Sequence, residues 1–225
     1  MKVKEKLMLD IQGLIKEGPI NIAIFGDSIS HGAFNCYRDY DSVYHTRLRR
    51  KLNAVRDMVP VNMINAGIGG TNATSSLVRL ERDVLSHPLD LIIVCFGLND
   101  INWPLEDYIS SLTEILTKCK ERCDVIFMTP NMMNTYVAED TAEDVVTYAA
   151  RMVGIQNDGK MDEFMDAARK VAASVGVPVC DCYAKWKELA KTQDTTMLLS
   201  NRVNHPTEEM HELFADALFE MIMAD

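Results

Sequence analysis

The chain has 225 residues, of which 48% are hydrophobic and 25% are charged, an ordinary globular composition. Its 23 Lys and Arg against 33 Asp and Glu give a net charge of −10, and the one basic run is RLRRK at 47–51. This balance excludes the basic face that nucleic-acid binding requires, so we expect no nucleic-acid partner. The length fits one domain over 1–225.

The first 18 residues predict an amino-terminal helix, because apolar residues recur there at helical spacing among scattered charges. Such a segment resembles neither a signal peptide nor a membrane span, and no later apolar run has the length that a bilayer requires. The sequence therefore predicts a cytoplasmic protein with no membrane partner. It leaves the oligomeric state open.

Strands and helices are predicted to alternate along the rest of the chain. Runs rich in β-forming residues predict strands at 20–26, 61–67, 91–97, 124–130 and 177–183. Helical spacing of apolar residues predicts helices at 42–56, 77–85, 108–121, 161–176 and after Pro206. The first strand carries four consecutive apolar residues, Ile22 to Phe25, as inner strands of parallel sheets do. This alternation indicates an α/β fold, a three-layer α/β/α sandwich around a parallel sheet.

The segment 131–160 is the least regular part of the chain and begins directly after a predicted strand. It is either an insertion that lines a pocket at that edge of the sheet or an ordinary surface insertion.

No metal, cofactor or disulfide framework is predicted. The six cysteines are too sparse for a disulfide scaffold, and none has the CxxC spacing of a zinc site. The GIGG sequence at 67–70 lacks the Lys of a P-loop and the spacing of a dinucleotide site, so nucleotide binding is not expected.

Three polar blocks follow the first three predicted strands: GDSIS at 26–30, NAGIGG at 65–70 and GLND at 97–100. Because parallel strands share their carboxyl edge, these blocks should meet at one rim, where α/β sheets bind ligands. Gly26 allows a sharp turn that places Ser28 at this rim. Taken alone, the tripeptide GDS at 26–28 is explained equally well by Asp27 or Ser28 capping the next helix.

The blocks contain the groups that acyl transfer needs: a nucleophile, a base and donors for the developing oxyanion. Ser28 is the candidate nucleophile. The backbone N–H groups of Ser28 and Gly70 and the side-chain amide of Asn99 are the candidate donors. The base is His205, which stands in NRVNHP just before the last predicted helix. His31 is a candidate pocket residue, too close to Ser28 in sequence to be the base.

These four blocks together resemble the SGNH, or GDSL, hydrolase family, whose signature is a Ser, a Gly, an Asn and a His in this order. The resemblance spans residues 20–222 and assigns Ser28, Gly70, Asn99 and His205 to those positions. It implies a flavodoxin-like sandwich with five parallel strands. It also implies hydrolysis of an ester or thioester through an acyl-serine intermediate.

One position departs from the family pattern. The family places an Asp three residues before its His, and this chain has Arg202 there. The backbone carbonyl of Arg202 could hold the imidazole, Asp194 or Asp181 could replace the missing acid, or the enzyme could be weak or inactive. We favour the Arg202 carbonyl, because a carbonyl is enough to fix the tautomer, and we expect Asp181 to cap the helix that contains Trp186.

The predicted function is that of a serine hydrolase of carboxylic esters, most simply a short-chain acetyl esterase on a small or carbohydrate substrate. NHP before a helix and GIGG in the second block are similar to carbohydrate and acetyl esterases of the family. Lysophospholipase or acyl-thioesterase activity uses the same chemistry with a longer acyl slot. A non-catalytic binding protein of the same fold is the alternative that Arg202 suggests.

Overall fold

Uninterrupted apolar runs form the inner strands of a parallel sheet in the computed structural model, which describes residues 1–224. β3 is buried along its whole length, and β1 along all but one residue. The strands are β1 (Ile20–Gly26), β2 (Val61–Gly67), β3 (Leu91–Cys95), β4 (Asp124–Met128) and β5 (Val179–Cys180). All four pairings are parallel in the order β2-β1-β3-β4-β5, the flavodoxin-like order. The predicted α/β fold is therefore confirmed.

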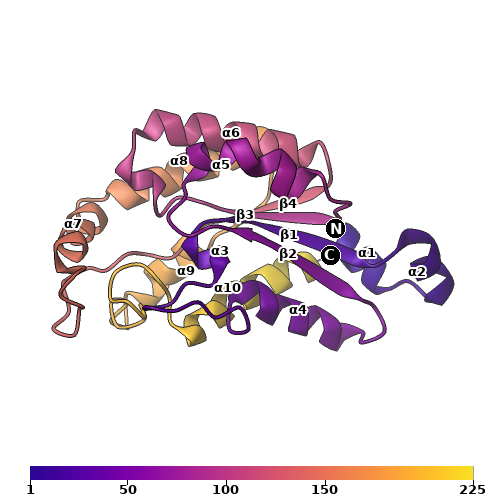
Figure 1. Ribbon diagram of the computed structural model, residues 1–225, viewed down its shortest axis with the longest axis horizontal. Helices are drawn as coiled ribbons and strands as arrows, with labels where there is room; N and C mark the ends of the chain where they lie inside the picture. The colour runs from indigo at the N-terminus through magenta and orange to yellow at the C-terminus, as the bar shows by residue number, and fades with distance from the viewer. Residues whose placement is uncertain (225) are drawn as a thin grey trace.

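Helices cover both faces of the sheet (Figure 1). One layer holds α5 (Ala73–Leu80), α6 (Leu105–Lys120) and α8 (Lys160–Val175), and the other holds α4 (Tyr44–Val55), α9 (Cys182–Leu189) and α10 (Glu208–Met223). The π-helical turn η1 (Glu81–Leu85) continues α5, and the 3-10 turn η2 (Asp100–Asn102) follows β3. The short α3 (Ser28–His31) follows β1 directly, and α7 (Val146–Asn157) lies at the left end of the molecule in Figure 1.

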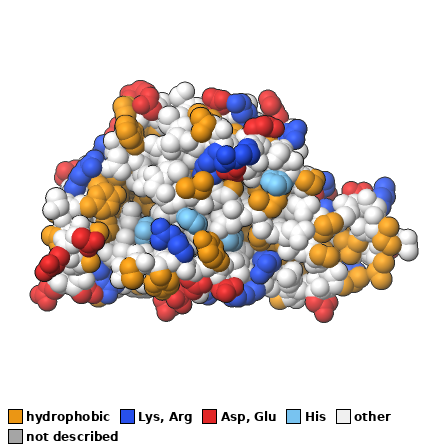
Figure 2. Space-filling model, in the orientation of Figure 1, with side chains coloured by type: hydrophobic (Ala, Val, Ile, Leu, Met, Phe, Trp, Pro, Cys, Tyr) orange, Lys and Arg blue, Asp and Glu red, His pale blue; other side chains and the backbone are white. Residues whose placement is uncertain are grey.

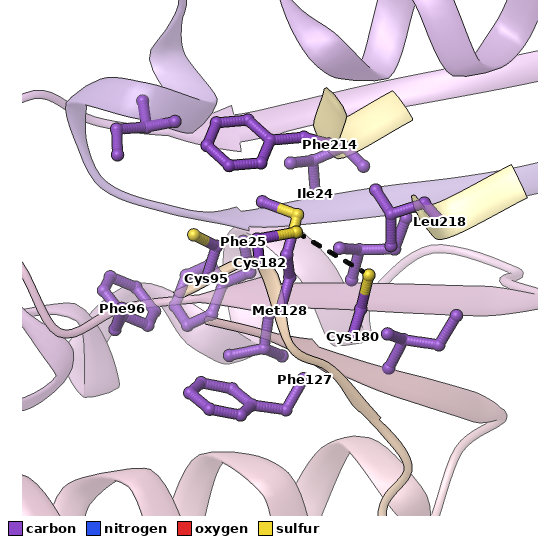
Figure 3. Packing of buried hydrophobic residues seen from close by; sticks show 14 of the residues in the cluster. Ile24, Phe25, Cys95, Phe96, Phe127, Met128, Cys180, Cys182, Phe214 and Leu218 are labelled. Carbon is purple, nitrogen blue, oxygen red and sulfur yellow. Dashed lines mark hydrogen bonds between the residues drawn. The ribbon is translucent and has the colours of Figure 1, made fainter. Parts of the chain in front are cut away.

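The hydrophobic core fills the space between the sheet and each helix layer. Figure 3 shows Phe214 and Leu218 of α10 on one side of the strands and Phe127 on the other. Phe25 and Phe96 pack edge to face at 5.2 Å between ring centroids. Interiors packed in this way move little, so the carboxyl ends of the strands form a fixed rim for the side chains that follow them.

The amino-terminal helix and the last three predicted strands differ from the structure. The amino-terminal helix expected over 1–18 is two helices, α1 (Lys2–Leu7) and α2 (Ile11–Glu17), because Asp10 accepts a hydrogen bond from the N–H of Gly13 at 2.8 Å and caps a new helix. The later strands end earlier than predicted. After β3 the chain turns at Gly97, whose φ of +142° leaves the extended conformation.

The irregular segment after β4 lies against the turn that carries His205. The N–H of Asn134 donates to the carbonyl of Val203 at 2.9 Å, and the side chain of Asn131 donates to the carbonyl of Asn204 at 2.9 Å. This part of the predicted insertion 131–160 therefore supports the histidine turn. Whether the segment also lines a pocket stays a prediction.

Candidate active site

Ser28 stands where the chain leaves the buried strand β1. Asp27 caps α3, because its Oδ1 accepts the N–H of Ile29 at 3.0 Å, and Ser28 is the first residue of that helix. A Cβ added at Gly26 would lie 2.6 Å from the carbonyl oxygen of Cys95, so only glycine fits between the strand ends. The capping role thus belongs to Asp27, and the same turn presents Ser28 at the rim.

Ser28 and His205 are joined across the rim. His205 Nε2 lies 3.0 Å from Ser28 Oγ, and His205 Nδ1 lies 2.6 Å from the backbone carbonyl oxygen of Phe34. A carbonyl oxygen can only accept, so Nδ1 carries the proton and donates it to Phe34. Nε2 is then the unprotonated nitrogen and accepts the hydroxyl hydrogen of Ser28. In this tautomer His205 Nε2 is able to take the proton of the Ser28 hydroxyl.

The Phe34 carbonyl is held by a tight loop. The N–H of Phe34 donates to the carbonyl of Tyr37 at 3.1 Å, and Ala33 and Arg38 form an antiparallel bridge. The buried Phe34 ring stacks on Tyr37 at 5.5 Å and contacts the ring of His211 at 4.9 Å between centroids. The acceptor for His205 is therefore as firmly placed as a side chain in the core.

The prediction that the Arg202 carbonyl orients His205 is wrong, since Phe34 fills that role. Arg202 has a φ of +57°, and its N–H donates to the carbonyl of Leu199 at 3.1 Å in a tight turn. Its guanidinium points to Asp140, with Nε at 3.0 Å from both carboxylate oxygens. Within this turn Asn201 Oδ1 accepts the N–H of His205 at 2.9 Å. Arg202 therefore stabilises the turn that precedes His205.

Neither of the two candidate acids replaces the missing aspartate. Asp194 accepts the hydroxyl of Tyr136 at 2.6 Å. Asp181 caps α9 through the N–H of Ala184 at 3.0 Å and pairs with Arg169 at 2.7 Å. The prediction that Asp181 caps the helix containing Trp186 is confirmed.

The three predicted oxyanion donors are Ser28 itself and two groups on the loops that follow β2 and β3. Within residues 1–224 the backbone N–H groups of Ser28 and Gly70 have no acceptor. Asn99 Nδ2 donates one hydrogen to the carbonyl of Thr71 at 2.9 Å, which places its amide beside Gly70 and leaves its second hydrogen for another acceptor. A Cβ added at Gly69 would lie 3.6 Å from Ser28 Cβ, so this loop lies against the serine. The three predicted donors therefore occupy neighbouring strand ends.

Buried polar residues fix the loop that holds these donors. The guanidinium of Arg79 donates to the carbonyl of Gly26 at 3.2 Å and to the carbonyl of Ala66, which ties β1 to β2. Asp100 Oδ1 accepts the N–H of Ala73 at 2.9 Å at the start of α5. The sequence predictions missed these roles and that of Phe34. For Asp100 the GLND block offered a signal, whereas a backbone carbonyl such as that of Phe34 leaves none.

Burial sets the protonation of the site. Burial lowers the pKa of His205 from its ordinary 6.5, and the positive charge of Arg38 lowers it further, while the bond to Phe34 opposes both. Burial raises the pKa of Asp27 to about 7, with a contribution from Asp100. It also raises the pKa of Asp100 to about 6. His205 is therefore neutral at neutral pH, and its Nε2 is free of a proton.

The remaining histidines near the rim have other partners. His31 Nδ1 accepts the N–H of Gly69 at 3.1 Å, so His31 holds the glycine loop beside Ser28. His45 and His211 are buried on α4 and α10, and burial lowers their pKa values to about 4 and about 3. His205 is thus the histidine that is bonded to the serine.

A parallel α/β/α sandwich with a serine and a histidine joined at the carboxyl edge of its sheet is the arrangement of a hydrolase. The chain belongs to the GDSL-like lipase/acylhydrolase family, which it matches over residues 24–213, and it is an ester hydrolase. The predicted family is therefore confirmed.

Solved structures share this fold. Axe2, an acetylxylan esterase from Geobacillus stearothermophilus solved as its W-to-I variant, superimposes with a TM-score of 0.70 at 21% identity over 90% of this chain and 94% of its own. LAE5, an alpha/beta hydrolase from the metagenome of Lake Arreo, Spain, superimposes with a TM-score of 0.72 at 19% identity over 93% of this chain and 99% of its own.

A curated relative is the uncharacterized lipoprotein YqeF of Bacillus subtilis (strain 168), which is 29% identical over 96 residues. The match covers 42% of this chain and 37% of YqeF, well under half of that protein. None of the helices formed by residues 1–224 combines the length and apolar character needed to cross a bilayer. The cytoplasmic location expected from the sequence stays a prediction.

Proposed function

We propose that the protein is a serine esterase that removes short acyl groups, with acetyl as the preferred group, from small or carbohydrate alcohols. The observation that carries this proposal is the continuous hydrogen-bonded line from Ser28 Oγ through His205 to the Phe34 carbonyl. The esterase Axe2 is described as acting on acetylxylan and on acetyl-xylooligosaccharides. Catalytic mutants of Axe2 alter a serine, a histidine and an aspartate three residues before that histidine.

The geometry supports a two-step mechanism. His205 Nε2 takes the proton of Ser28 Oγ as that oxygen attacks the ester carbonyl carbon, and the former carbonyl oxygen becomes an oxyanion. The N–H groups of Ser28 and Gly70 and the amide of Asn99 donate to this oxyanion. When the tetrahedral intermediate collapses, the protonated His205 gives its Nε2 proton to the leaving alcohol. Water then attacks the acyl-serine with His205 as base, which releases the acid and restores Ser28.

The Phe34 carbonyl performs the orienting part of the usual aspartate's work. It accepts the Nδ1 proton at 2.6 Å and so fixes the tautomer and the ring plane of His205. Its partial negative charge also favours the imidazolium that forms in each step, although less than a full carboxylate charge does. An enzyme of this kind needs no acid at position 202.

Exposed aromatic side chains on the active-site loops support a carbohydrate alcohol. Tyr37 and Tyr40 are 47% and 56% exposed on the loop that carries the Phe34 carbonyl, and Trp103 is 59% exposed just after η2. Aromatic rings that are partly open to water are suited to stack on flat faces of sugar rings.

The test is hydrolysis of p-nitrophenyl esters from acetate to palmitate, together with release of acetate from acetylated xylooligosaccharides. We expect the highest kcat/KM with acetate and a steady fall with chain length. Preference for long chains would replace the acetyl esterase with a lysophospholipase or thioesterase. If the folded protein hydrolyses no ester and a fluorophosphonate does not label it, the chain is a binding protein and the proposal is wrong.

The pH profile should report His205. Because the pKa of His205 lies below 6.5, the base stays unprotonated down to lower pH, and kcat/KM should fall only below pH 6.5. Arg38→Gln removes the charge that helps to lower this pKa, so the acidic limb should move up toward 6.5. Asp27, with a pKa of about 7, is the other buried group that titrates in this range. A limb near pH 7 that Arg38→Gln leaves in place would assign the profile to Asp27.

A further inference from the structure

Arg38 lies at the mouth of the active site. It is exposed, and Nη1 donates to the carbonyl of Tyr37 at 3.3 Å. A Cβ added at Gly69 would lie 3.5 Å from Arg38 Nη2 and 3.6 Å from Ser28 Cβ, so the guanidinium and the nucleophile flank the same point of the glycine loop. The bridge between Ala33 and Arg38 holds the arginine on the loop whose Phe34 carbonyl binds His205.

The charge of Arg38 is not neutralised by the acids around it. In the part of the chain that the structure describes, 1–224, Arg38 forms no ion pair. The neighbouring carboxylates are engaged elsewhere, since Asp39 accepts the N–H groups of Asp41 and Ser42 at 2.7 and 3.1 Å, and Glu208 accepts the hydroxyl of Tyr37 at 3.1 Å.

The field of this arginine reaches the base. Arg38 lowers the pKa of both His205 and His31, so both imidazoles lie within range of its charge. Figure 2 shows Lys or Arg and His side chains gathered over α3 in the middle of this face. An unpaired cation opposes the imidazolium that His205 must become during the reaction. An anion bound to Arg38 would remove this penalty at the moment when substrate occupies the site.

We propose that Arg38 binds an anionic group, a carboxylate or a phosphate, on the alcohol part of the substrate ester. This inference rests on the proposed esterase function and narrows its substrates to acylated alcohols that carry a negative charge. The alcohol part is the relevant one because His205 gives its proton to the leaving oxygen. Arg38 lies on the loop whose Phe34 carbonyl holds the imidazole. Guanidinium groups bind carboxylate and phosphate oxygens through paired N–H donors.

The test compares two acetyl esters of similar size, 4-acetoxybenzoate, which is anionic, and 4-acetoxybenzamide, which is neutral. Rates are measured at about pH 8, where His205 is unprotonated with or without Arg38. Arg38→Gln should lower the ratio of kcat/KM for the anionic ester to that for the neutral ester about tenfold, and Arg38→Lys should keep part of it. Arg82→Gln is the control, because Arg82 is also exposed to solvent but belongs to η1, which follows α5 away from the rim.

Added salt should reduce the same ratio in the wild-type enzyme, because screening weakens an exposed ion pair. An unchanged ratio in Arg38→Gln, or an equal fall for both esters, would overturn the role in anion recognition while leaving the esterase in place.

Binding to Ser28→Ala separates the two proposals if the wild type hydrolyses neither ester. NMR titration with 4-acetoxybenzoate should then show tighter binding than with the benzamide, and the difference should vanish when Arg38→Gln is added. Equal affinity for the two esters would overturn the anion site itself.

Discussion

Ser28→Ala is expected to abolish ester hydrolysis, with a fall in kcat on the order of 10⁴-fold or more. In the proposed mechanism Ser28 Oγ forms the acyl-enzyme, and alanine offers His205 no hydroxyl from which to take a proton. The residual rate would come from substrate binding and the oxyanion donors acting on water. The measurement is release of p-nitrophenol from the acetate ester, with labelling by a fluorophosphonate as the second readout.

The matched control for this variant is Ser86→Ala. Ser86 Oγ donates to the carbonyl of Arg82 at 2.8 Å at the end of η1, far along the chain from the rim. This control should keep full activity and full labelling. Thermal unfolding of both variants should match that of the wild type, since Ser28 Oγ makes a single hydrogen bond, to His205. Hydrolysis that survives in a folded Ser28→Ala protein would remove the serine from the mechanism.

The sequence predicted the elements whose signals are local. The consecutive apolar residues of β1 determine a buried strand, and Gly26 and Asp27 end it in a way that places Ser28. His205 could be found because it precedes Pro206 and the last helix, which begins at Glu208. These positions follow from hydrophobic pattern, turn chemistry and capping, each of which acts over a few residues.

The missed part of the site depends on contacts between distant segments. Phe34 and His205 are 171 residues apart, and the contact is made by a carbonyl that every residue possesses. No residue type at position 34 could have marked it. The prediction for Arg202 was wrong because this arginine stands where the family has its aspartate, which suggested that its own carbonyl replaces the acid. The group that binds His205 Nδ1 is instead the Phe34 carbonyl, on the loop that follows α3.

This arrangement separates two functions that a triad aspartate combines. The fixed Phe34 carbonyl orients the imidazole, and it contributes no formal charge. The positive charge of Arg38 acts on His205 without an aspartate to balance it. If an anionic group of the substrate neutralises Arg38, the enzyme is most active on esters of anionic alcohols. The absence of an aspartate beside His205 would then make the enzyme selective for such substrates.

Asn99→Ala is expected to lower kcat by about 10²- to 10³-fold with little change in KM, the effect of losing one oxyanion donor. Asn99 Nδ2 donates one hydrogen to the carbonyl of Thr71 at 2.9 Å, which fixes the amide beside the glycine loop and leaves its second hydrogen for the oxyanion. The donor is fixed before the substrate arrives, so it stabilises the transition state without reorganising. Alanine removes it and leaves Ser28 and His205 intact.

The control must remove a bond at the same place without removing an oxyanion donor. Asn102→Ala does so, because Asn102 Nδ2 donates to the backbone carbonyl of Asn99 at 3.0 Å and holds the same turn. If Asn102→Ala lowers kcat as much as Asn99→Ala, the loss comes from the loosened turn rather than from the amide. If only Asn99→Ala loses activity while fluorophosphonate labelling persists at a reduced rate, the amide acts on the oxyanion itself, because the serine and its base still react.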